Sequence, residues 1–177
     1  MVEKYKIIKN FLTKDETDIY KRYCLIKHRL GSETMYDPAV PFATSSYGDP
    51  AMESLMLVKK IKMQEITGLK LLPTYAYWRM YVWDNDLYFH KDRPSCEISL
   101  TVHFGSDETH DWPIFMDKKP VILKPGDAVV YKGCDIEHGR EKYKGDWYAQ
   151  AFLHYVDAEG PNSHLYKDGR QLWGTPK

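Results

Sequence analysis

The stretch Tyr88-Phe-His-Lys-Asp-Arg-Pro-Ser-Cys-Glu-Ile-Ser-Leu-Thr-Val-His-Phe104 decides the fold. Near its start a histidine and an aspartate, His90 and Asp92, stand two residues apart. From Ile98 to Phe104 apolar and polar residues alternate, which predicts a strand with one apolar face. Residues i and i+2 of a strand point the same way, so His90 and Asp92 can present an imidazole and a carboxylate to one point. The pair is either part of a metal site or two solvated side chains at a strand end.

Alternating patterns extend the β region on both sides of this stretch. Residues 75–83 alternate and place four polar or aromatic side chains on one strand face: Tyr75, Tyr77, Arg79 and Tyr81. Shorter strands are expected at residues 112–116, 121–123, 128–131 and 147–155. Pro125-Gly126 is typical of a turn. The second half of the chain is therefore predicted to be a set of short strands.

Two helices are predicted ahead of the strands. Thr13 and Glu16 have the spacing of a capping box, and Gly31 is expected to end the first helix. Its apolar face is predicted from helical spacing to hold Ile19, Tyr23, Ile26 and Leu30. Asp49-Pro50 begins a second helix that ends at Gly68. The predicted apolar face of this helix consists of Leu55, Val58 and Ile61.

The remaining segments lack sustained periodicity. Residues 31–48, rich in Ser, Thr, Pro and Tyr, are predicted to form a long surface loop that covers a site. The tail, residues 157–177, is expected to be loop-like. Helices followed by many short strands indicate an α+β fold, with the strands in a sandwich or roll. We predict one domain, residues 1–177, with a helical part at 1–70 and a β-roll core at 71–156.

Composition narrows the classes of partner and compartment. The chain has 25 Lys plus Arg and 25 Asp plus Glu among 177 residues, so no overall positive field attracts nucleic acid or an anionic membrane. Its three cysteines, Cys24, Cys96 and Cys134, are widely spaced and form no CxxC pair. This pattern fits neither a disulfide framework nor a structural zinc knuckle. Without a signal peptide or a long apolar run, we expect a cytoplasmic protein.

A third candidate ligand, His138, lies in Cys134-Asp-Ile-Glu-His-Gly-Arg140. A neighbouring strand could bring it to His90 and Asp92. Two histidines and one carboxylate occupy one face of an octahedron and leave the opposite face open, as in non-haem Fe(II) oxygenases. Zinc is the competing metal for this set of ligands.

The order of these elements resembles the Fe(II)/2-oxoglutarate-dependent dioxygenases, in particular their prolyl-hydroxylase-like branch. Helices come first, then a tyrosine-bearing strand, the HxD pair, several strands, Pro125-Gly-Asp-Ala-Val-Val-Tyr131, and a histidine. The resemblance extends from about Tyr5 to Tyr155. It implies a double-stranded β-helix (a jelly roll, cupin-like), with the N-terminal helices packed on its major sheet. It also implies that His90, Asp92 and His138 bind and use the iron.

The resemblance implies a co-substrate, 2-oxoglutarate, whose far carboxylate is held by a basic residue at the start of the strand after the distal histidine. Here that position reads Trp147. A buried carboxylate without a cation is costly, so another residue must supply the charge. Arg140 is our first choice, Arg79 the second and Lys144 the third, while Arg140 has the alternative of pairing with Glu137 or Glu141 at the surface. Further co-substrate contacts are expected from Tyr81, Thr101 and His103. Ser99, Thr101 and His103 share a strand face that is predicted to line a polar cavity, with a hydrated strand face as the alternative.

The activity implied by the resemblance is decarboxylation of 2-oxoglutarate coupled to hydroxylation, with Fe(II), 2-oxoglutarate and O2. The substrate is expected to be a small molecule or a peptide, with a prolyl side chain as the leading choice. Two alternatives remain open from the sequence. One is a β-roll that binds a metal or ligand without turnover, and the other is a zinc-dependent hydrolase. The sequence predicts neither the primary substrate nor the oligomeric state.

Overall fold

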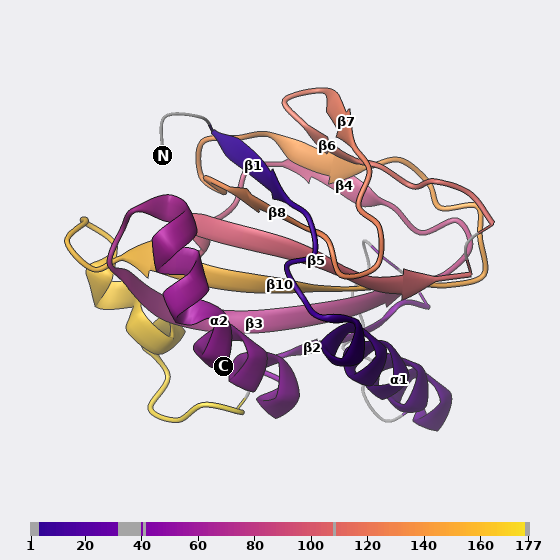
Figure 1. Cartoon of the computed structure of the whole chain (residues 1–177), viewed down its shortest axis with the longest axis horizontal. Coiled ribbons are helices and arrows are strands. Elements are labelled where there is room, and N and C mark those ends of the chain that lie inside the picture. The colour runs from indigo at the N-terminus through magenta and orange to yellow at the C-terminus, as the bar shows by residue number, and fades with distance from the viewer. Residues whose placement is uncertain (1–3, 32–39, 41, 108, 176–177) are drawn as a thin grey trace.

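The computed structural model describes residues 4–31, 40, 42–107 and 109–175. Two antiparallel sheets face each other (Figure 1). The larger has the order β1-β8-β5-β10-β3-β2 and the smaller the order β4-β9-β6-β7. The large sheet contains β1 (Tyr5–Ile8), β2 (Thr44–Tyr47), β3 (Leu71–Tyr81), β5 (Ile98–Ser106), β8 (Ala128–Tyr131) and β10 (Tyr148–Asp157). The small sheet contains β4 (Leu87–His90), β6 (Ile114–Met116), β7 (Lys119–Val121) and β9 (His138–Arg140).

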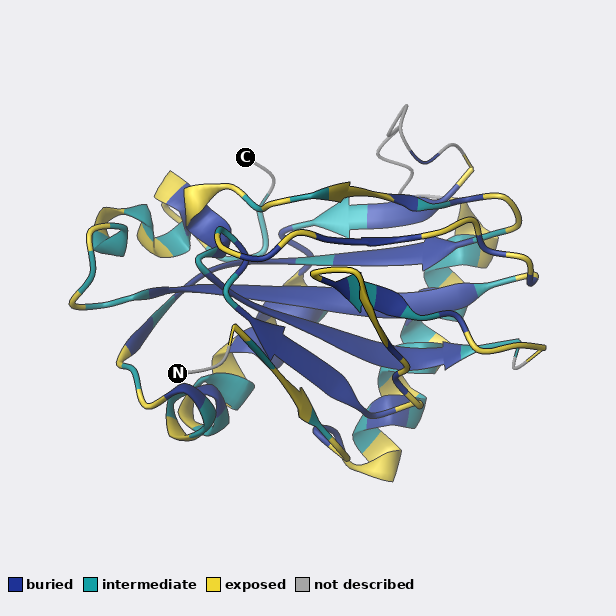
Figure 2. Cartoon of the chain, turned by 90° about the horizontal axis from the view of Figure 1, so that it is seen from above, coloured by how far each residue is buried: buried dark blue, intermediate teal, exposed yellow. Residues whose placement is uncertain are grey.

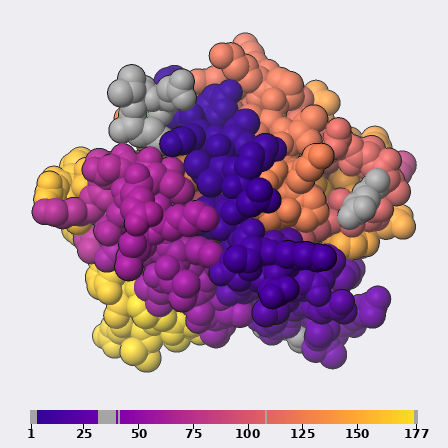
Figure 3. All heavy atoms as spheres, viewed as in Figure 1, coloured from indigo at the N-terminus to yellow at the C-terminus, as the bar shows by residue number. Residues whose placement is uncertain are grey.

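Two helices, α1 (Lys14–Leu30) and α2 (Pro50–Thr67), cover the outer face of the large sheet (Figures 1 and 3). The sheets and helices together form an α+β jelly roll, so the predicted fold class is confirmed. No helix in the described parts of the chain has the length and apolar character needed to cross a membrane.

Local capping chemistry fixes the helix ends where the sequence predicts them. The Thr13 hydroxyl accepts a hydrogen bond from the backbone N–H of Glu16, and the Glu16 carboxylate accepts one from the N–H of Thr13. The Asp49 carboxylate accepts hydrogen bonds from two N–H groups in the first turn of α2. Gly31 and Gly68 end the two helices in the left-handed conformation, with φ of 62° and 72°, which glycine adopts without strain.

The predicted apolar faces of the helices were mostly wrong. Five of the predicted residues are largely exposed: Ile19, Ile26, Leu30, Val58 and Ile61. On α1 the contact with the sheet is made by Cys24 and by aromatic rings, since Tyr20 stacks on Phe104 with 5.3 Å between ring centroids. On α2 the buried face consists of Met52, Leu55, Met56 and Met63. Of the residues predicted for α2, only Leu55 belongs to that face.

The two faces of the large sheet bury different side chains. Its outer face forms an apolar core with the helices through Ala76, Trp78 and Met80 of β3 and through Ala149, Ala151 and Leu153 of β10. Figure 2 shows how completely these strands are buried. The residues between them in sequence face the interior of the roll, so the alternation predicted for β3 is confirmed.

Two segments differ from the expected loops. Residues 44–47 of the predicted loop form β2, an edge strand that pairs with β3. The part of that loop at residues 32–39 and 41 lies outside the described residues. The tail contains two short turns of 3₁₀-helix within Ser163–Gly169, packed against β3.

Candidate active site

Three side chains predicted as ligands converge at one end of the roll. His90 ends β4 and His138 begins β9, and these residues are directly paired in the small sheet. Asp92 lies two residues beyond the end of β4, and its backbone N–H donates to the carbonyl of Gly133 at 2.9 Å. Asp92 Oδ1 is 3.4 Å from His90 Nε2 and 3.5 Å from His138 Nε2. Ligand atoms about 2.1 Å from one ion stand roughly 3.0–3.5 Å apart, so the spacing fits a shared metal.

The backbone sets both imidazole rings in the tautomer that a metal requires. His90 Nδ1 is 2.7 Å from the carbonyl of Tyr88, and His138 Nδ1 is 3.1 Å from that of Ile136. A carbonyl only accepts hydrogen bonds, so each Nδ1 carries the ring proton and donates it. Each Nε2 therefore presents a lone pair toward Asp92. Three acceptors directed at one point repel one another unless a cation lies between them.

Asp92 is held by its surroundings as a carboxylate. Ser99 Oγ is 3.0 Å from Asp92 Oδ2 and donates a hydrogen bond to it. Gly133 also packs against Asp92, and a side chain at position 133 would collide with the carboxylate. Burial acts to raise the pKa of Asp92, but the neighbouring His138 and His90 lower it well below its usual range. The negative charge is thus maintained next to the two histidines.

A cavity of about 340 Å³ lies beside the three ligands. Besides the three ligands it is lined by Tyr75, Tyr77, Arg79, Leu87, Tyr131, Phe152 and His154. The wall formed by β3 and β10 is mainly aromatic, because Tyr77 and Phe152 are directly paired across these strands. His154 is buried, and burial lowers the pKa of its imidazole to about 4. An open, partly aromatic chamber therefore adjoins the candidate metal site.

A second group of buried polar side chains, which we call the polar basin, lies deeper in the roll. We define the basin by Tyr81, His103, Arg140, Tyr148 and Gln150. Arg140 is 1% exposed and donates to Gln150 Oε1 at 2.8 Å, to Tyr148 Oη at 3.3 Å and to the carbonyl of Trp112. No carboxylate of a described residue forms an ion pair with this guanidinium. The suggested surface pairing of Arg140 with Glu137 or Glu141 was therefore wrong.

Several polar atoms of the basin have no hydrogen-bond partner. These buried atoms include Tyr81 Oη, His103 Nε2, Arg140 Nε and Gln150 Nε2. The ring of His103 lies flat on that of Tyr148, 4.0 Å between centroids, and its Nδ1 donates to the carbonyl of Leu123. Leaving a buried polar group unsatisfied costs about 1–3 kcal/mol. A basin with several such groups is arranged for something other than stability.

The other predicted co-substrate residues are distributed between the chamber and the surface. Arg79 lies in the chamber wall and donates to Tyr77 Oη at 2.9 Å. Thr101 is fully buried, with its Oγ1 3.2 Å from Tyr131 Oη. Because Thr101 and His103 are both buried, the hydrated-face alternative was wrong. Lys144 is exposed beside Asp84 at 3.4 Å, so it is not a basin residue.

Sequence reasoning missed Tyr148 and Gln150 as basin residues. Trp147 packs against the helix-side core, and the next residue, Tyr148, takes the position that faces inward. The signal was present in the alternation of β10, since Gln150, Phe152 and His154 share one phase and the apolar Ala149, Ala151 and Leu153 share the other. His154, next to the ligands, was also missed as a site residue, while Ser99 of the predicted polar lining lies beside Asp92.

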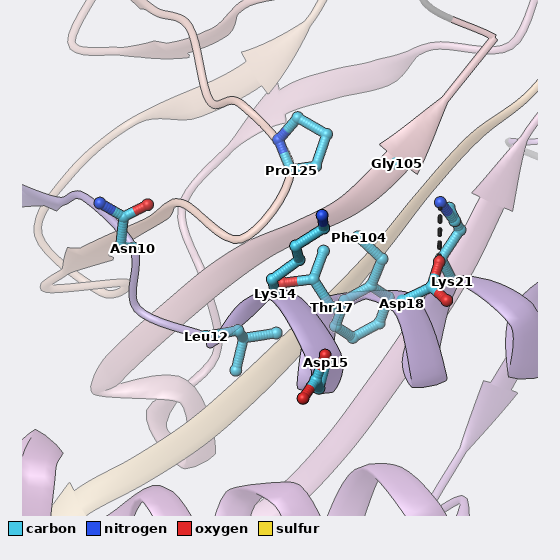
Figure 4. Close-up of a pocket in the computed structure, with 10 residues that line it drawn as sticks. All are labelled: Asn10, Leu12, Lys14, Asp15, Thr17, Asp18, Lys21, Phe104, Gly105 and Pro125. Carbon is cyan, nitrogen blue, oxygen red and sulfur yellow. Dashed lines mark ion pairs between the residues drawn. The ribbon is translucent and has the colours of Figure 1, made fainter.

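Another cavity, of about 510 Å³, lies on the opposite side of the large sheet (Figure 4). It is situated between α1, Gly105 of β5 and Pro125. Its charged side chains have mixed signs, and Lys21 is paired with Asp18 at 3.0 Å. None of its residues belongs to a cluster of His, Cys, Asp or Glu able to hold a metal within the described chain. The candidate metal ligands of the described chain therefore lie inside the roll and not in this second cavity.

Several solved structures share this architecture, and the titles of most of them name 2-oxoglutarate or alpha-ketoglutarate. The SnoK structure, an alpha-ketoglutarate-dependent carbocyclase from nogalamycin biosynthesis, matches with a TM-score of 0.73 and 13% identity over 99% of this chain and 89% of that chain. A Pseudomonas putida prolyl-4-hydroxylase matches with a TM-score of 0.68 and 13% identity, covering 88% of this chain and 94% of that chain. The fold is that of the Fe(II)/2-oxoglutarate oxygenases. HygX from Streptomyces hygroscopicus, solved with nickel and 2-oxoglutarate bound, matches with a TM-score of 0.67 and 12% identity. The match covers 88% of this chain and 84% of that chain.

The likeness to these oxygenases is one of fold and not of sequence. No protein-family model matches the chain, and no curated protein matches it in sequence. The structural neighbours include prolyl hydroxylases, so the predicted resemblance to that branch is confirmed at the level of the fold.

Proposed function

We propose that this protein is an Fe(II)- and 2-oxoglutarate-dependent oxygenase. The observation that carries the proposal is the pairing of two sites within one roll. At one end, two imidazole lone pairs and a carboxylate converge on a point beside an open chamber. Deeper in the roll lies a buried guanidinium with no carboxylate partner among the described residues. The first site suits a metal ion, and the buried guanidinium suits one carboxylate of a dicarboxylate whose other end binds that metal.

The ligand set supports iron through its geometry. His90, Asp92 and His138 occupy one side of an ion and leave the side toward the chamber open. A facial set of two histidines and one carboxylate is typical of non-haem Fe(II) oxygenases. When bound, iron with 2-oxoglutarate supplies the oxidising chemistry that side chains alone do not provide. The chain's own task is to fix the ion with three ligands whose tautomers are already set.

Arg140 is our proposed anchor for the far carboxylate of 2-oxoglutarate. Its guanidinium is buried, and it already donates to Gln150 Oε1 and Tyr148 Oη, which hold it in place. Arg140 Nε, Gln150 Nε2 and Tyr81 Oη are unsatisfied donors of the same basin. A carboxylate would accept hydrogen bonds from these groups and balance the charge of the guanidinium. Arg79 and Thr101 are proposed to line the path to the metal, with His103 beside the tail.

The finer reaction that we propose is hydroxylation of a small molecule or a peptide, with a prolyl residue as one candidate. The presence of Asp92 supports hydroxylation over halogenation, because a carboxylate occupies the position at which halogenases that resemble this chain would bind a halide. The chamber wall of Tyr75, Tyr77 and Phe152 would shield the reacting carbon from water. Structural neighbours support a range of substrates, because their titles include an epimerase and prolyl hydroxylases.

Anaerobic absorption spectroscopy tests this proposal. Fe(II) and 2-oxoglutarate, added together without oxygen, are expected to produce a visible charge-transfer band from bidentate binding to the metal. Arg140→Ala is expected to raise the 2-oxoglutarate concentration for half-maximal absorption by at least about 30-fold, which corresponds to roughly 2 kcal/mol. Lys144→Ala is the matched control, since it removes an exposed cation outside the basin.

The outcome also separates the alternative functions. A band absent from the wild-type protein, together with zinc retained after purification, would favour a hydrolase or a ligand-binding roll. A band that needs the same 2-oxoglutarate concentration in Arg140→Ala as in the wild-type protein would remove Arg140 as the anchor.

A further inference from the structure

The imidazole of His154 lies beside the metal ligands but has no part in binding the metal or 2-oxoglutarate in the proposed function. His154 lies on β10 and faces the chamber. Its Nδ1 is 2.9 Å from Ser99 Oγ, and the same hydroxyl oxygen is 3.0 Å from both Asp92 Oδ2 and the carbonyl oxygen of Cys96. These contacts form a chain from the chamber wall to a metal ligand.

Counting hydrogens along this chain fixes the tautomer of His154. The Ser99 hydroxyl has one hydrogen, and both Asp92 Oδ2 and the Cys96 carbonyl only accept hydrogen bonds. A hydroxyl hydrogen directed at His154 Nδ1 would leave Ser99 Oγ facing two acceptor oxygens at 3.0 Å with no hydrogen between them, so the hydrogen goes to one of these two oxygens. Ser99 Oγ must then accept from His154, which places the ring proton on Nδ1. The neutral imidazole keeps a lone pair on Nε2.

The lone pair of His154 Nε2 is available in the chamber. Nε2 has no hydrogen-bond partner among the described residues, and His154 is part of the chamber lining. Of the neighbouring hydroxyls, Tyr75 Oη is 3.0 Å from Cys96 Sγ, and Tyr77 Oη accepts from Arg79 at 2.9 Å. An acceptor thus stands within a wall whose other surfaces are mainly ring faces.

Aromatic rings surround His154 in the chamber wall. The centroid of Tyr75 is 4.5 Å from that of His154. The rings of Phe152 and His154 are nearly parallel, with an interplanar angle of 3° and 6.4 Å between centroids. The centroid of Tyr77 is 6.0 Å from that of Phe152. Ring faces recognise a cyclic ligand by stacking and apolar contact but provide no strong hydrogen bonds. The acceptor on His154 adds the directional contact.

We propose that His154 Nε2 accepts a hydrogen bond from an O–H or N–H group of the substrate, and that the substrate is a cyclic small molecule that carries this donor. This inference rests on the proposed function, since it names the substrate class of the same site. It favours a phenol, a cyclic alcohol or a ring with an N–H over a peptidyl prolyl residue. A proline within a peptide has no N–H on its ring and therefore offers no donor to His154.

The tautomer is tested first, by nitrogen NMR of the full-length, ¹⁵N-labelled protein. We expect Nδ1 of His154 to carry the proton and Nε2 to have the resonance of an unprotonated ring nitrogen. Ser99→Ala removes the acceptor for Nδ1–H and should shift the ring toward a mixture of tautomers. A wild-type protein with the proton on Nε2 would overturn the proposal, whatever the enzyme does with 2-oxoglutarate.

Donor recognition is tested with phenol and anisole, which differ in the O–H group. Phenol is expected to bind the protein at least about fivefold more tightly than anisole, as one hydrogen bond predicts, and to shift the Nε2 resonance. His154→Phe keeps a ring but removes the acceptor, so the preference should disappear. His154→Gln retains an acceptor and should restore part of it. His164→Phe, at an exposed histidine, is the matched control and should keep the full preference.

The two proposals fail in different ways. Equal binding of phenol and anisole by the wild-type protein, alongside a normal charge-transfer band, would overturn only the role of His154. A phenol preference that depends on His154, without any charge-transfer band, would support the acceptor while the oxygenase function fails.

Discussion

The two faces of the large sheet are made by the same strands but differ in chemistry. The outer face of β10 presents Ala149, Ala151 and Leu153 to the helices, in a core whose described residues leave no side-chain polar atom unsatisfied. The inner face of β10 presents Tyr148, Gln150, Phe152 and His154 to the interior of the roll, where several buried polar atoms lack partners. The outer face stabilises the fold, while the inner face retains polar groups for ligands.

Removing a metal ligand is expected to have the largest effect and to be confined to the inner face. His138→Ala deletes one of three ligands, so we expect Fe(II) or Co(II) affinity to fall by more than about 100-fold, beyond the usual effect of a supporting residue. The free energy of unfolding of the metal-free protein should change little, because the repulsion among the three acceptors is relieved. Metal titration and urea denaturation of the same sample measure both quantities. An unchanged metal affinity would contradict the assignment of His138.

A substitution that leaves a cavity in the outer face should have the opposite effects, lowering stability and leaving metal affinity unchanged. Leu153→Ala truncates a fully buried side chain and is expected to lower the free energy of unfolding by about 2–5 kcal/mol. Metal affinity of the folded fraction should stay near that of the wild-type protein, since Leu153 faces away from the ligands. Chemical denaturation checks the first expectation and titration at low temperature the second. A large loss of metal affinity without loss of stability would refute the division between the two faces.

The tail is expected to stabilise the loop that carries Asp92. Asp168 accepts from both terminal nitrogens of Arg93 at 2.9 and 2.8 Å, from Ser95 Oγ at 2.6 Å and from Tyr47 Oη at 2.6 Å. Asp168→Asn should destabilise the protein by about 2 kcal/mol at pH 7, as expected for lost hydrogen bonds to a charged group. Glu159→Gln is the control, because its pairing with Lys70 is exposed.

The effect of Asp168→Asn should depend on pH. Burial acts to raise the pKa of Asp168, but the Arg93 guanidinium, Ser95 and Tyr47 lower it below its ordinary value. A depressed folded-state pKa gives stability that is complete above the unfolded pKa, about 3.9, and is lost as the pH falls toward the folded value. The difference between wild type and Asp168→Asn should therefore shrink below about pH 4. A difference that stays constant from pH 7 to pH 2 would contradict the ionic role of Asp168.

A smaller effect on stability is expected in the polar basin. Gln150→Leu removes a buried amide whose Nε2 is unsatisfied but whose Oε1 accepts a hydrogen bond from Arg140, so the free energy of unfolding should fall by about 1–2 kcal/mol. The affinity for 2-oxoglutarate should nevertheless fall several-fold, because Arg140 loses the group that holds it. Denaturation and 2-oxoglutarate titration of the Fe(II) protein measure the two effects. A strongly destabilised Gln150→Leu variant with unchanged 2-oxoglutarate affinity would assign the basin to the fold.

Short-range patterns predicted most of the architecture. Thr13, Asp49 and the glycines that follow each helix act through neighbours within four residues, so their caps could be read directly. The spacing of His90 and Asp92 and the position of His138 likewise predicted which side chains the fold brings together. The helix faces could not be read, because the sheet selects aromatic rings and methionines on one side of each helix over the branched apolar residues on the other.

The basin was harder to predict because it depends on the register between distant strands. A shift of one residue in a strand exchanges its two faces. In β10 the pairing with β5 has an irregularity between Ala149 and Gln150, next to the position in question. The extra residue of this irregularity lies on β5, so β10 keeps its alternation, with Trp147 on the helix side and Tyr148 facing inward. The edge strand β2 was missed for a similar reason, since its four residues are ordered by pairing with β3.

Anomalous diffraction from crystals grown without oxygen in Mn(II) and 2-oxoglutarate tests the central claim most directly. The account predicts one manganese peak, about 2.0–2.3 Å from His90 Nε2, Asp92 Oδ1 and His138 Nε2, with the far carboxylate of 2-oxoglutarate on Arg140. A peak at any other place, or a 2-oxoglutarate bound away from the basin, would contradict it.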